Sequence, residues 1–147
     1  MLIIFRKLRL ISLSAQKKYS VILNQKISGY HKYVKEFSDR PFLDIDDRVI
    51  KMVAEESDKI TINILCTASP YDYAGLLVAK LDWECIASHF SDNDNYFFHV
   101  HGNNKIRILD KLYPKNKYDY NFALSDSEGD LKLLALFKKS ILYKNNA

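Results

Sequence analysis

His99 and His101, two histidines separated by one residue, are the clearest candidates for chemistry in this sequence. Residues i and i+2 of a β-strand point to the same side, so on a strand both imidazoles would share one face and could hold a divalent metal ion. Glu84 or Asp82 is the available third ligand, but neither stands at a diagnostic spacing from the histidines. Two surface or half-buried histidines beside a turn are therefore the simpler interpretation.

Two kinds of catalysis can be tested against these residues. A metal-dependent nuclease of the H-x-H type would also need a nucleophilic tyrosine on a nearby helix, and Tyr143 on the predicted last helix is the candidate. Acid/base chemistry would use Asp82, Glu84 and His89, but residues two apart on a helix do not share a face. The sequence contains no G-x-S-x-G, P-loop or G-x-G-x-x-G motif. We therefore expect no enzyme, with no catalytic residue, cofactor or metal.

The two cysteines, Cys66 and Cys85, lie in apolar stretches and form no C-x-x-C pair, which argues against a structural zinc site. A disulfide between them is one interpretation. The favoured interpretation is that both are buried free thiols in a reducing compartment.

The first residues, MLIIFRKLRL, do not have the pattern of a signal peptide. Arg6, Lys7 and Arg9 interrupt the apolar run, and no small-residue cleavage site follows. The longest stretch without charge, residues 60–71, is shorter than the roughly 18 residues of a membrane span. We expect a soluble, cytoplasmic protein.

Charge is distributed unevenly along the chain. Residues 1–35 hold eight lysines and arginines and no acidic residue, whereas residues 39–58 hold seven acidic residues and three basic ones. Such polarity can steer a charged macromolecule, although two opposite solvated faces would give the same pattern. The basic segment also carries Tyr19, Tyr30 and Tyr33, a combination that could hold phosphates and stack on bases. These tyrosines fit a protein core equally well.

The predicted fold is a single α+β domain over residues 1–147, with 48% apolar residues to form one core. We expect a mixed, mostly antiparallel sheet and about three packed helices. The predicted strands are an N-terminal β-hairpin (2–14 and 19–23), then 59–66, 96–101, 105–109 and 118–124. The predicted helices are 47–57, capped by Asp46 or Asp47, then 70–89 and 128–143, the last started by the capping box Ser125-x-x-Glu128.

The hairpin competes with one helix over residues 15–37, because the apolar residues there also fit a 3.6-residue period. Ser28-Gly29 lies in the middle of that span, and a glycine inside a helix costs about 1 kcal/mol relative to alanine. The hairpin is therefore the favoured interpretation.

Two motifs carry a family resemblance. The first follows the basic N-terminal segment and reads S-G-Y-x-x-Y-V-x-x-F-x-D-R over residues 28–40. The second, after an aromatic strand, reads S-D-S-E-G-D-L-K-L-L-A-L-F-K-K-S over residues 125–140. Together they resemble the CdiI-type immunity proteins of bacterial contact-dependent growth inhibition systems. The likeness covers about the first 43 and the last 40 residues, and the middle of the chain matches only by the type of element.

The resemblance implies a cytoplasmic binding protein that neutralises the C-terminal toxin domain, often a nuclease, of a secreted effector. Inhibitors of basic nucleases are commonly acidic, whereas this chain has a net charge of +4, a departure that argues against simple mimicry of DNA. The acidic segment could still meet a basic toxin cleft, and the basic segment could equally meet an acidic toxin. We expect the toxin interface at the acidic residues Asp39, Asp44, Asp46, Asp47, Glu55 and Glu56. The alternative is a small nucleic-acid-binding or H-x-H nuclease-like protein.

Overall fold

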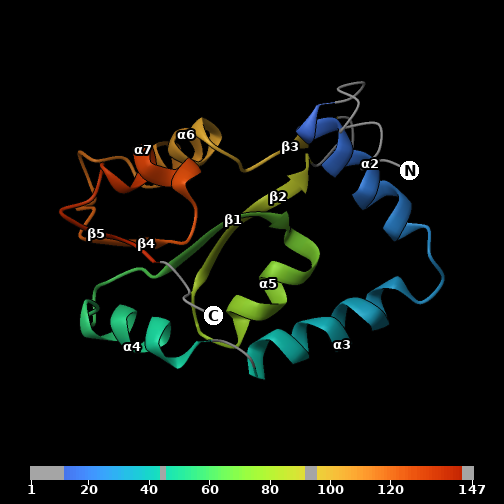
Figure 1. Ribbon diagram of the computed structural model, residues 1–147, viewed down its shortest axis with the longest axis horizontal. Coiled ribbons are helices and arrows are strands. Elements are labelled where there is room, and N and C mark those ends of the chain that lie inside the picture. Colours follow the sequence, from blue (N-terminus) through green and yellow to red (C-terminus); the bar gives the residue numbers. More distant parts are fainter. Residues whose placement is uncertain (1–11, 44–45, 92–95, 144–147) are drawn as a thin grey trace. The chain divides into compact units, whose positions relative to one another are not determined.

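The computed structural model describes residues 12–43, 46–91 and 96–143, and it describes side chains in these ranges except at residues 37–43. Contacts within the chain group into two compact units. Unit 1 comprises Met1–Ile45 and Ile64–Val100, and unit 2 comprises Asp46–Asn63 and His101–Ala147. Helices and strands occur in both units, which confirms the α+β class (Figure 1).

Unit 1 begins with two helices, α2 (Leu13–Gln25) and α3 (Tyr30–Leu43). The Ser12 hydroxyl caps α2 by accepting a hydrogen bond of 3.1 Å from the amide of Ala15. The helices are separated by a short turn in which Gly29 has a φ of +77°, a left-handed conformation that glycine adopts without a steric penalty.

The predicted β-hairpin is wrong at its second strand, residues 19–23, which is part of α2. Most of its first strand lies outside the described residues. The competing helical interpretation is closer, and Ser28-Gly29 interrupts the helix as its composition indicates. The β-branched and aromatic residues that suggested a strand give way here to the 3.6-residue period.

The centre of unit 1 is a β-α-β arrangement (Figure 1). Strand β1 (Ile64–Pro70) leads into helix α5 (Tyr71–Ala79), and strand β2 (Glu84–Phe90) returns parallel to β1 with Ile64 opposite Glu84. The short strand β3 (Phe97–Phe98) pairs antiparallel with the other edge of β2. Helix α5 packs against both parallel strands, and α3 packs against α5. The buried apolar residues of this unit are Val21, Ala74, Val78, Ile86, Ala87, Phe97 and Val100.

Three predicted elements of this region are corrected. The strand expected over residues 59–66 begins only at Ile64, and the helix expected over residues 70–89 ends at Ala79. Asp82 has a φ of +56° in the turn after α5, which ends the helical path and lets the chain re-enter the sheet. The strand expected over residues 96–101 is reduced to β3.

Unit 2 contains a second parallel strand pair. Its elements are α4 (Asp47–Glu55), α6 (Asn103–Leu112), β4 (Phe122–Ser125), the 3₁₀ turn η1 (Glu128–Asp130), α7 (Leu131–Leu134) and β5 (Lys139–Leu142). Strands β4 and β5 are parallel, with Phe122 opposite Lys139. Leu109, Tyr120 and Leu134 are buried, and the Tyr120 ring stacks on Phe137 at 5.0 Å between centroids.

The helix predicted over residues 47–57 is confirmed as α4, whereas three other predictions in unit 2 are wrong. Residues 105–109 are helical, the strand expected over 118–124 begins at Phe122, and the helix expected over 128–143 is replaced by η1, α7 and β5. The capping serine is Ser127, whose hydroxyl accepts from the Gly129 amide at 3.2 Å.

Among the described residues, the three-stranded sheet is mixed and the two-stranded sheet is parallel, so the pairings are not mostly antiparallel. Of the pairings among the described strands, β1–β2 and β4–β5 are parallel and only β2–β3 is antiparallel. The described residues also contain six α-helices rather than about three. Within the described ranges, no helix combines the length and the apolar composition that crossing a bilayer requires.

Candidate interaction surfaces

Asp46, one of the predicted interface residues, is held by contacts inside unit 2. Its carboxylate caps α4 through the Arg48 amide at 3.0 Å and accepts hydrogen bonds from the Arg48 guanidinium at 2.9 and 2.7 Å. The Tyr143 hydroxyl donates to the same carboxylate at 2.6 Å. Hydrogen bonds from Arg48 and Tyr143 hold the pKa of the Asp46 carboxyl well below its usual range. Asp46 is therefore an anchor between α4 and the end of β5.

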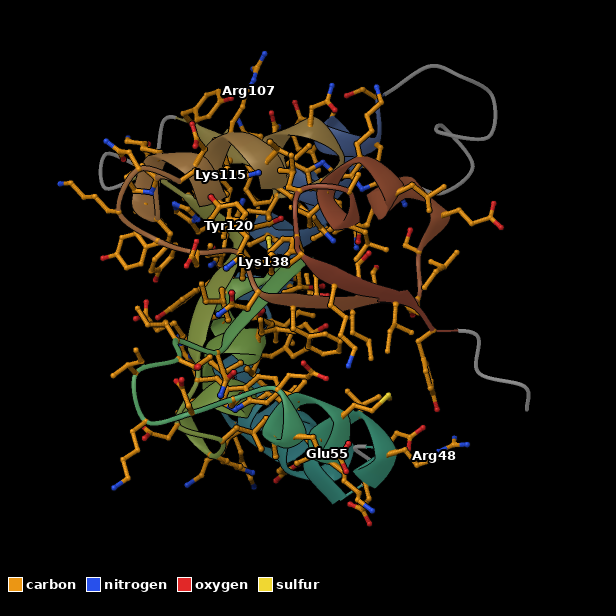
Figure 2. All side chains as sticks on the ribbon, turned by 90° about the vertical axis from the view of Figure 1, so that its left-hand side faces the viewer. Arg48, Glu55, Arg107, Lys115, Tyr120 and Lys138 are labelled. Atoms are coloured by element: carbon orange, nitrogen blue, oxygen red, sulfur yellow. The ribbon has the colours of Figure 1, made fainter. Side chains whose placement is uncertain are left out.

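The other predicted interface acids fall into three groups. The side chains of Asp39 and Asp44 lie outside the described residues. Glu56 accepts a hydrogen bond from Lys139 within unit 2. Asp47 and Glu55 are exposed at the two ends of α4, next to the exposed Arg48 and Lys51. Figure 2 shows Arg48 and Glu55 on this helix. The structure brings Asp46, Asp47, Glu55 and Glu56 onto one helix and its cap, but the exposed face of that helix is mixed in charge.

His99 and His101 do not share the face of a strand. Strand β3 ends at Phe98, and neither histidine is part of a strand. His99 is 6% exposed and stacks on the Phe97 ring at 6.3 Å between centroids, whereas His101 is exposed. The two histidines also belong to different units. Among the described residues, no group of three or more histidine, cysteine, aspartate and glutamate side chains is placed to hold a metal ion.

The predicted acid/base candidates are also separated. Asp82 lies in the turn after α5, while Glu84 and His89 lie on β2 rather than on a helix. The His89 imidazole Nδ1 is 2.9 Å from the Ala87 carbonyl oxygen.

The two cysteines are free thiols on the neighbouring strands β1 and β2, and burial raises the pKa of Cys85. Tyr143, expected late on a helix, follows β5.

Helix α2 and the turn after it expose a row of apolar side chains. Tyr19, Leu23 and Ile27 are 50%, 54% and 53% exposed. Tyr19 and Leu23 are four residues apart and share one side of α2, and Ile27 follows in the turn after the helix. We call these three residues the α2 stripe. The described part of the basic segment adds Lys17, Lys18, Lys26, Lys32 and Lys35, with no acidic residue before Glu36. The apolar period of this segment was visible in the sequence, but the period alone does not tell a buried face from an exposed one.

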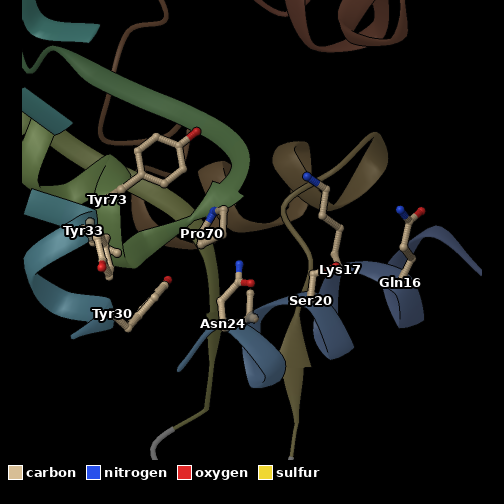
Figure 3. Close-up of a pocket in the computed structure, with 10 residues that line it drawn as sticks. Gln16, Lys17, Ser20, Asn24, Tyr30, Tyr33, Pro70 and Tyr73 are labelled. Atoms are coloured by element: carbon tan, nitrogen blue, oxygen red, sulfur yellow. The ribbon is translucent and has the colours of Figure 1, made fainter. Parts of the chain in front are cut away.

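A hollow of about 470 Å³ lies in unit 1 beside the α2 stripe. Figure 3 shows Tyr30, Tyr33 and Tyr73 gathered at one end and Lys17 and Gln16 at the other, with Asn24, Ser20 and Pro70 between them. We call this hollow the tyrosine pocket.

The Tyr30 side chain in the wall of the tyrosine pocket is fixed by an acid. Its hydroxyl donates a hydrogen bond to the Asp72 carboxylate at 3.1 Å. Burial, with the negative charge and hydrogen bond of Asp72, raises the pKa of the Tyr30 hydroxyl to about 12. The ring is therefore neutral and held in place at physiological pH.

Comparisons with known proteins were made with family models, with curated proteins and with solved structures, and none of the three gives a significant match to this chain.

Proposed function

We propose that this chain is an immunity protein of the CdiI type, which binds the C-terminal toxin domain of a contact-dependent growth inhibition effector in the cytoplasm and neutralises it without turnover. The family resemblance supports this proposal through its two motifs. The first, residues 28–40, covers the turn after α2 and most of α3, and the second, residues 125–140, runs from the end of β4 into β5.

The observation that carries the proposal is the α2 stripe. Large apolar side chains that stay exposed in a row, with charged residues around them, are typical of a protein interface rather than of a free surface. Tyrosine is also enriched among the residues that contribute most of the binding energy at interfaces. Tyr19 and its two aliphatic neighbours therefore form a surface suited to a partner protein.

The charge of the segment indicates which partner fits. Lys17, Lys18 and Lys26 accompany the stripe, and no acidic residue precedes Glu36. Complementary charge at the rim of an interface speeds association and suppresses wrong partners. We therefore propose a toxin domain that presents an apolar patch with an acidic rim to α2. The acidic interface predicted from the sequence is the rival assignment, and among its described side chains Asp47 and Glu55 are exposed.

The decisive experiment expresses this chain with the toxin domain encoded beside its gene. A one-to-one complex that protects the cells is the expected result. An isolated chain that leaves the toxin fully active, with no complex by size-exclusion chromatography, contradicts the proposal.

Two pairs of variants then separate the rival interfaces. Replacing Leu23 and Ile27 together by glutamate is expected to weaken the complex by about a hundredfold or more, since central interface residues each contribute about 2 kcal/mol or more. Ile60→Glu, at an exposed apolar residue of unit 2, is the matched control.

The acidic interface is tested by Asp47→Lys with Glu55→Lys. The control is Asp110→Lys with Asp126→Lys, which reverses two exposed acids outside α4. Asp46 is left unchanged because its replacement would also disturb the contacts with Arg48 and Tyr143. Loss of binding in the α4 pair alone would move the interface from α2 to α4.

A further inference from the structure

The tyrosine pocket combines aromatic and cationic groups at opposite ends, an arrangement that the binding of a partner protein by the α2 stripe does not require. Its volume of about 470 Å³ falls in the range of small-molecule sites, roughly 300 to 1,000 Å³. Both walls belong to unit 1, since one is formed by α2 and the other by α3, Pro70 and α5.

The aromatic end offers a surface for a flat ring. Tyr33 is 61% exposed while it lines the hollow, so its ring is accessible to a ligand. Tyr30 is held by its hydrogen bond to Asp72 and remains uncharged, which keeps a second ring in a fixed place. Stacking on tyrosine is the common way in which proteins hold nucleobases, and it tolerates every base.

The opposite end offers groups that bind an anion. Lys17 brings a positive charge there, and between the two ends the Ser20 hydroxyl and the Asn24 amide add hydrogen-bond donors. None of the residues that line the hollow is acidic, and the lysines of the segment add a positive field.

We propose that the tyrosine pocket binds a nucleotide, with the base stacked on Tyr33 and the phosphate held by Lys17. A planar ring joined to an anion matches both ends of the hollow, whereas an inorganic anion or an uncharged ring matches only one end. The nucleotide can be a free mononucleotide or one residue of a single-stranded nucleic acid, since both present the same chemistry.

The test titrates the purified chain with adenosine 5′-monophosphate, adenosine and inorganic phosphate by calorimetry, and follows backbone amide shifts by NMR. We expect the monophosphate to bind and each part alone to bind at least about tenfold more weakly, because a charge-assisted hydrogen bond contributes roughly that factor. The shifts should centre on residues 16–24 and 30–34. Absence of any binding at millimolar concentrations would overturn the proposal.

Matched variants separate the pocket from the basic surface around it. Tyr33→Ala is expected to weaken binding about five- to a hundredfold, the usual loss of one stacking partner, and Tyr33→Phe to retain it. Tyr19→Ala removes a similarly exposed tyrosine that does not line the hollow and should change nothing. Lys17→Gln should weaken binding about tenfold while Lys18→Gln, next to it but outside the lining, should not. Equal losses in both members of either pair would refute the pocket.

A thymidine hexamer identifies the source of the nucleotide. If the hexamer binds more tightly than the mononucleotide, with an affinity that falls more steeply as salt increases, the natural ligand is a single strand. If the hexamer shows no gain, the ligand is a free nucleotide. These titrations need no toxin domain, so they decide the pocket independently of the proposed immunity function.

Discussion

The Lys105 ammonium lies 2.6 Å from a carboxylate oxygen of Asp130 in unit 2, and only 11% and 8% of the two side chains are exposed. The Ser125 hydroxyl donates to the same carboxylate oxygen at 2.8 Å. This buried cluster ties α6, η1 and the end of β4 together. A buried ion pair contributes little net stability as a pair, but removal of one partner leaves an uncompensated charge.

Replacing Lys105 by methionine is therefore expected to destabilise unit 2 by about 3 to 5 kcal/mol. Urea unfolding followed by circular dichroism, with an unchanged m-value, measures this loss. The matched control is Lys138→Met, because Lys138 pairs with Asp119 at 3.2 Å on the exposed surface. That substitution should lower the free energy of unfolding by less than about 1 kcal/mol. Equal effects of the two substitutions would show that the buried pair has no special role.

Ser88, on β2, connects β1 to the segment that follows β3 in unit 1. Its buried hydroxyl donates to the Ala68 carbonyl and accepts from the Val100 amide, both at 3.0 Å. Ser88→Ala leaves that buried amide without its acceptor, and we expect a loss of about 1 to 3 kcal/mol in the free energy of unfolding. Ser14→Ala, at an exposed position of α2, is the control and should change it by no more than about 0.5 kcal/mol. The prediction fails if the two variants unfold at the same urea concentration.

The Asp46 cluster predicts a response to acid. Because the pKa of Asp46 is lower in the folded chain than in the unfolded one, its contribution is complete above about pH 4 and is lost as the pH falls below that value. Tyr143→Phe removes one of the hydrogen bonds and should raise the pKa of Asp46. NMR titration of the Asp46 carboxyl carbon measures the pKa of Asp46 in the unsubstituted chain and in the variant. An unchanged titration in the variant would contradict the role assigned to Tyr143.

Tyr30 predicts a response to alkali. Its pKa is raised to about 12, so its contribution to stability is complete below about pH 10 and is lost as the pH rises toward 12. Asp72→Asn removes the negative charge, and we expect the Tyr30 pKa to fall, although burial still holds it above 10. The ultraviolet titration difference between each protein and its Tyr30→Phe derivative isolates this group. A midpoint near 10 in the unsubstituted chain would refute the contact with Asp72.

The sequence predicted best where a local signal decides the structure. Asp46 followed by an amphipathic segment predicted α4 with its cap. Gly29 correctly indicates a break in the helix considered over residues 15–37, but it led to the wrong choice of a hairpin. Both depend on nearby residues alone, a side-chain cap in one case and a left-handed backbone in the other.

Predictions failed where contacts between residues far apart in the sequence decide the secondary structure. Residues 84–90 continue the apolar pattern of α5, and a buried parallel strand has no alternation that tells it from a buried helix. The alternation of polar and apolar residues over 105–109 predicted a strand. In the structure this segment is part of α6, where Lys105 and Leu109 lie about one helical turn apart and are both buried. The partner that makes a buried lysine acceptable, Asp130, is not visible from the segment itself.

In the candidate interaction surfaces, too, local signals were readable from the sequence and long-range contacts were not. A count of charges found the acidic segment, but it could not show that Asp46 and Glu56 are engaged within unit 2. The Asp46-x-Arg48 spacing was the available signal for one of these contacts. The tyrosine pocket had weaker signals, because Pro70 and Tyr73 reach α2 only through the tertiary structure.

The contact between Asp46 and Tyr143 spans 97 positions of the chain. During synthesis, α4 therefore emerges from the ribosome long before the tyrosine that secures its cap, while β1, α5 and β2 are contiguous and can assemble at once. Unit 2 therefore gains this contact only after β5 has been made, and a nascent chain held on a ribosome stalled before β5 should leave α4 open to proteases.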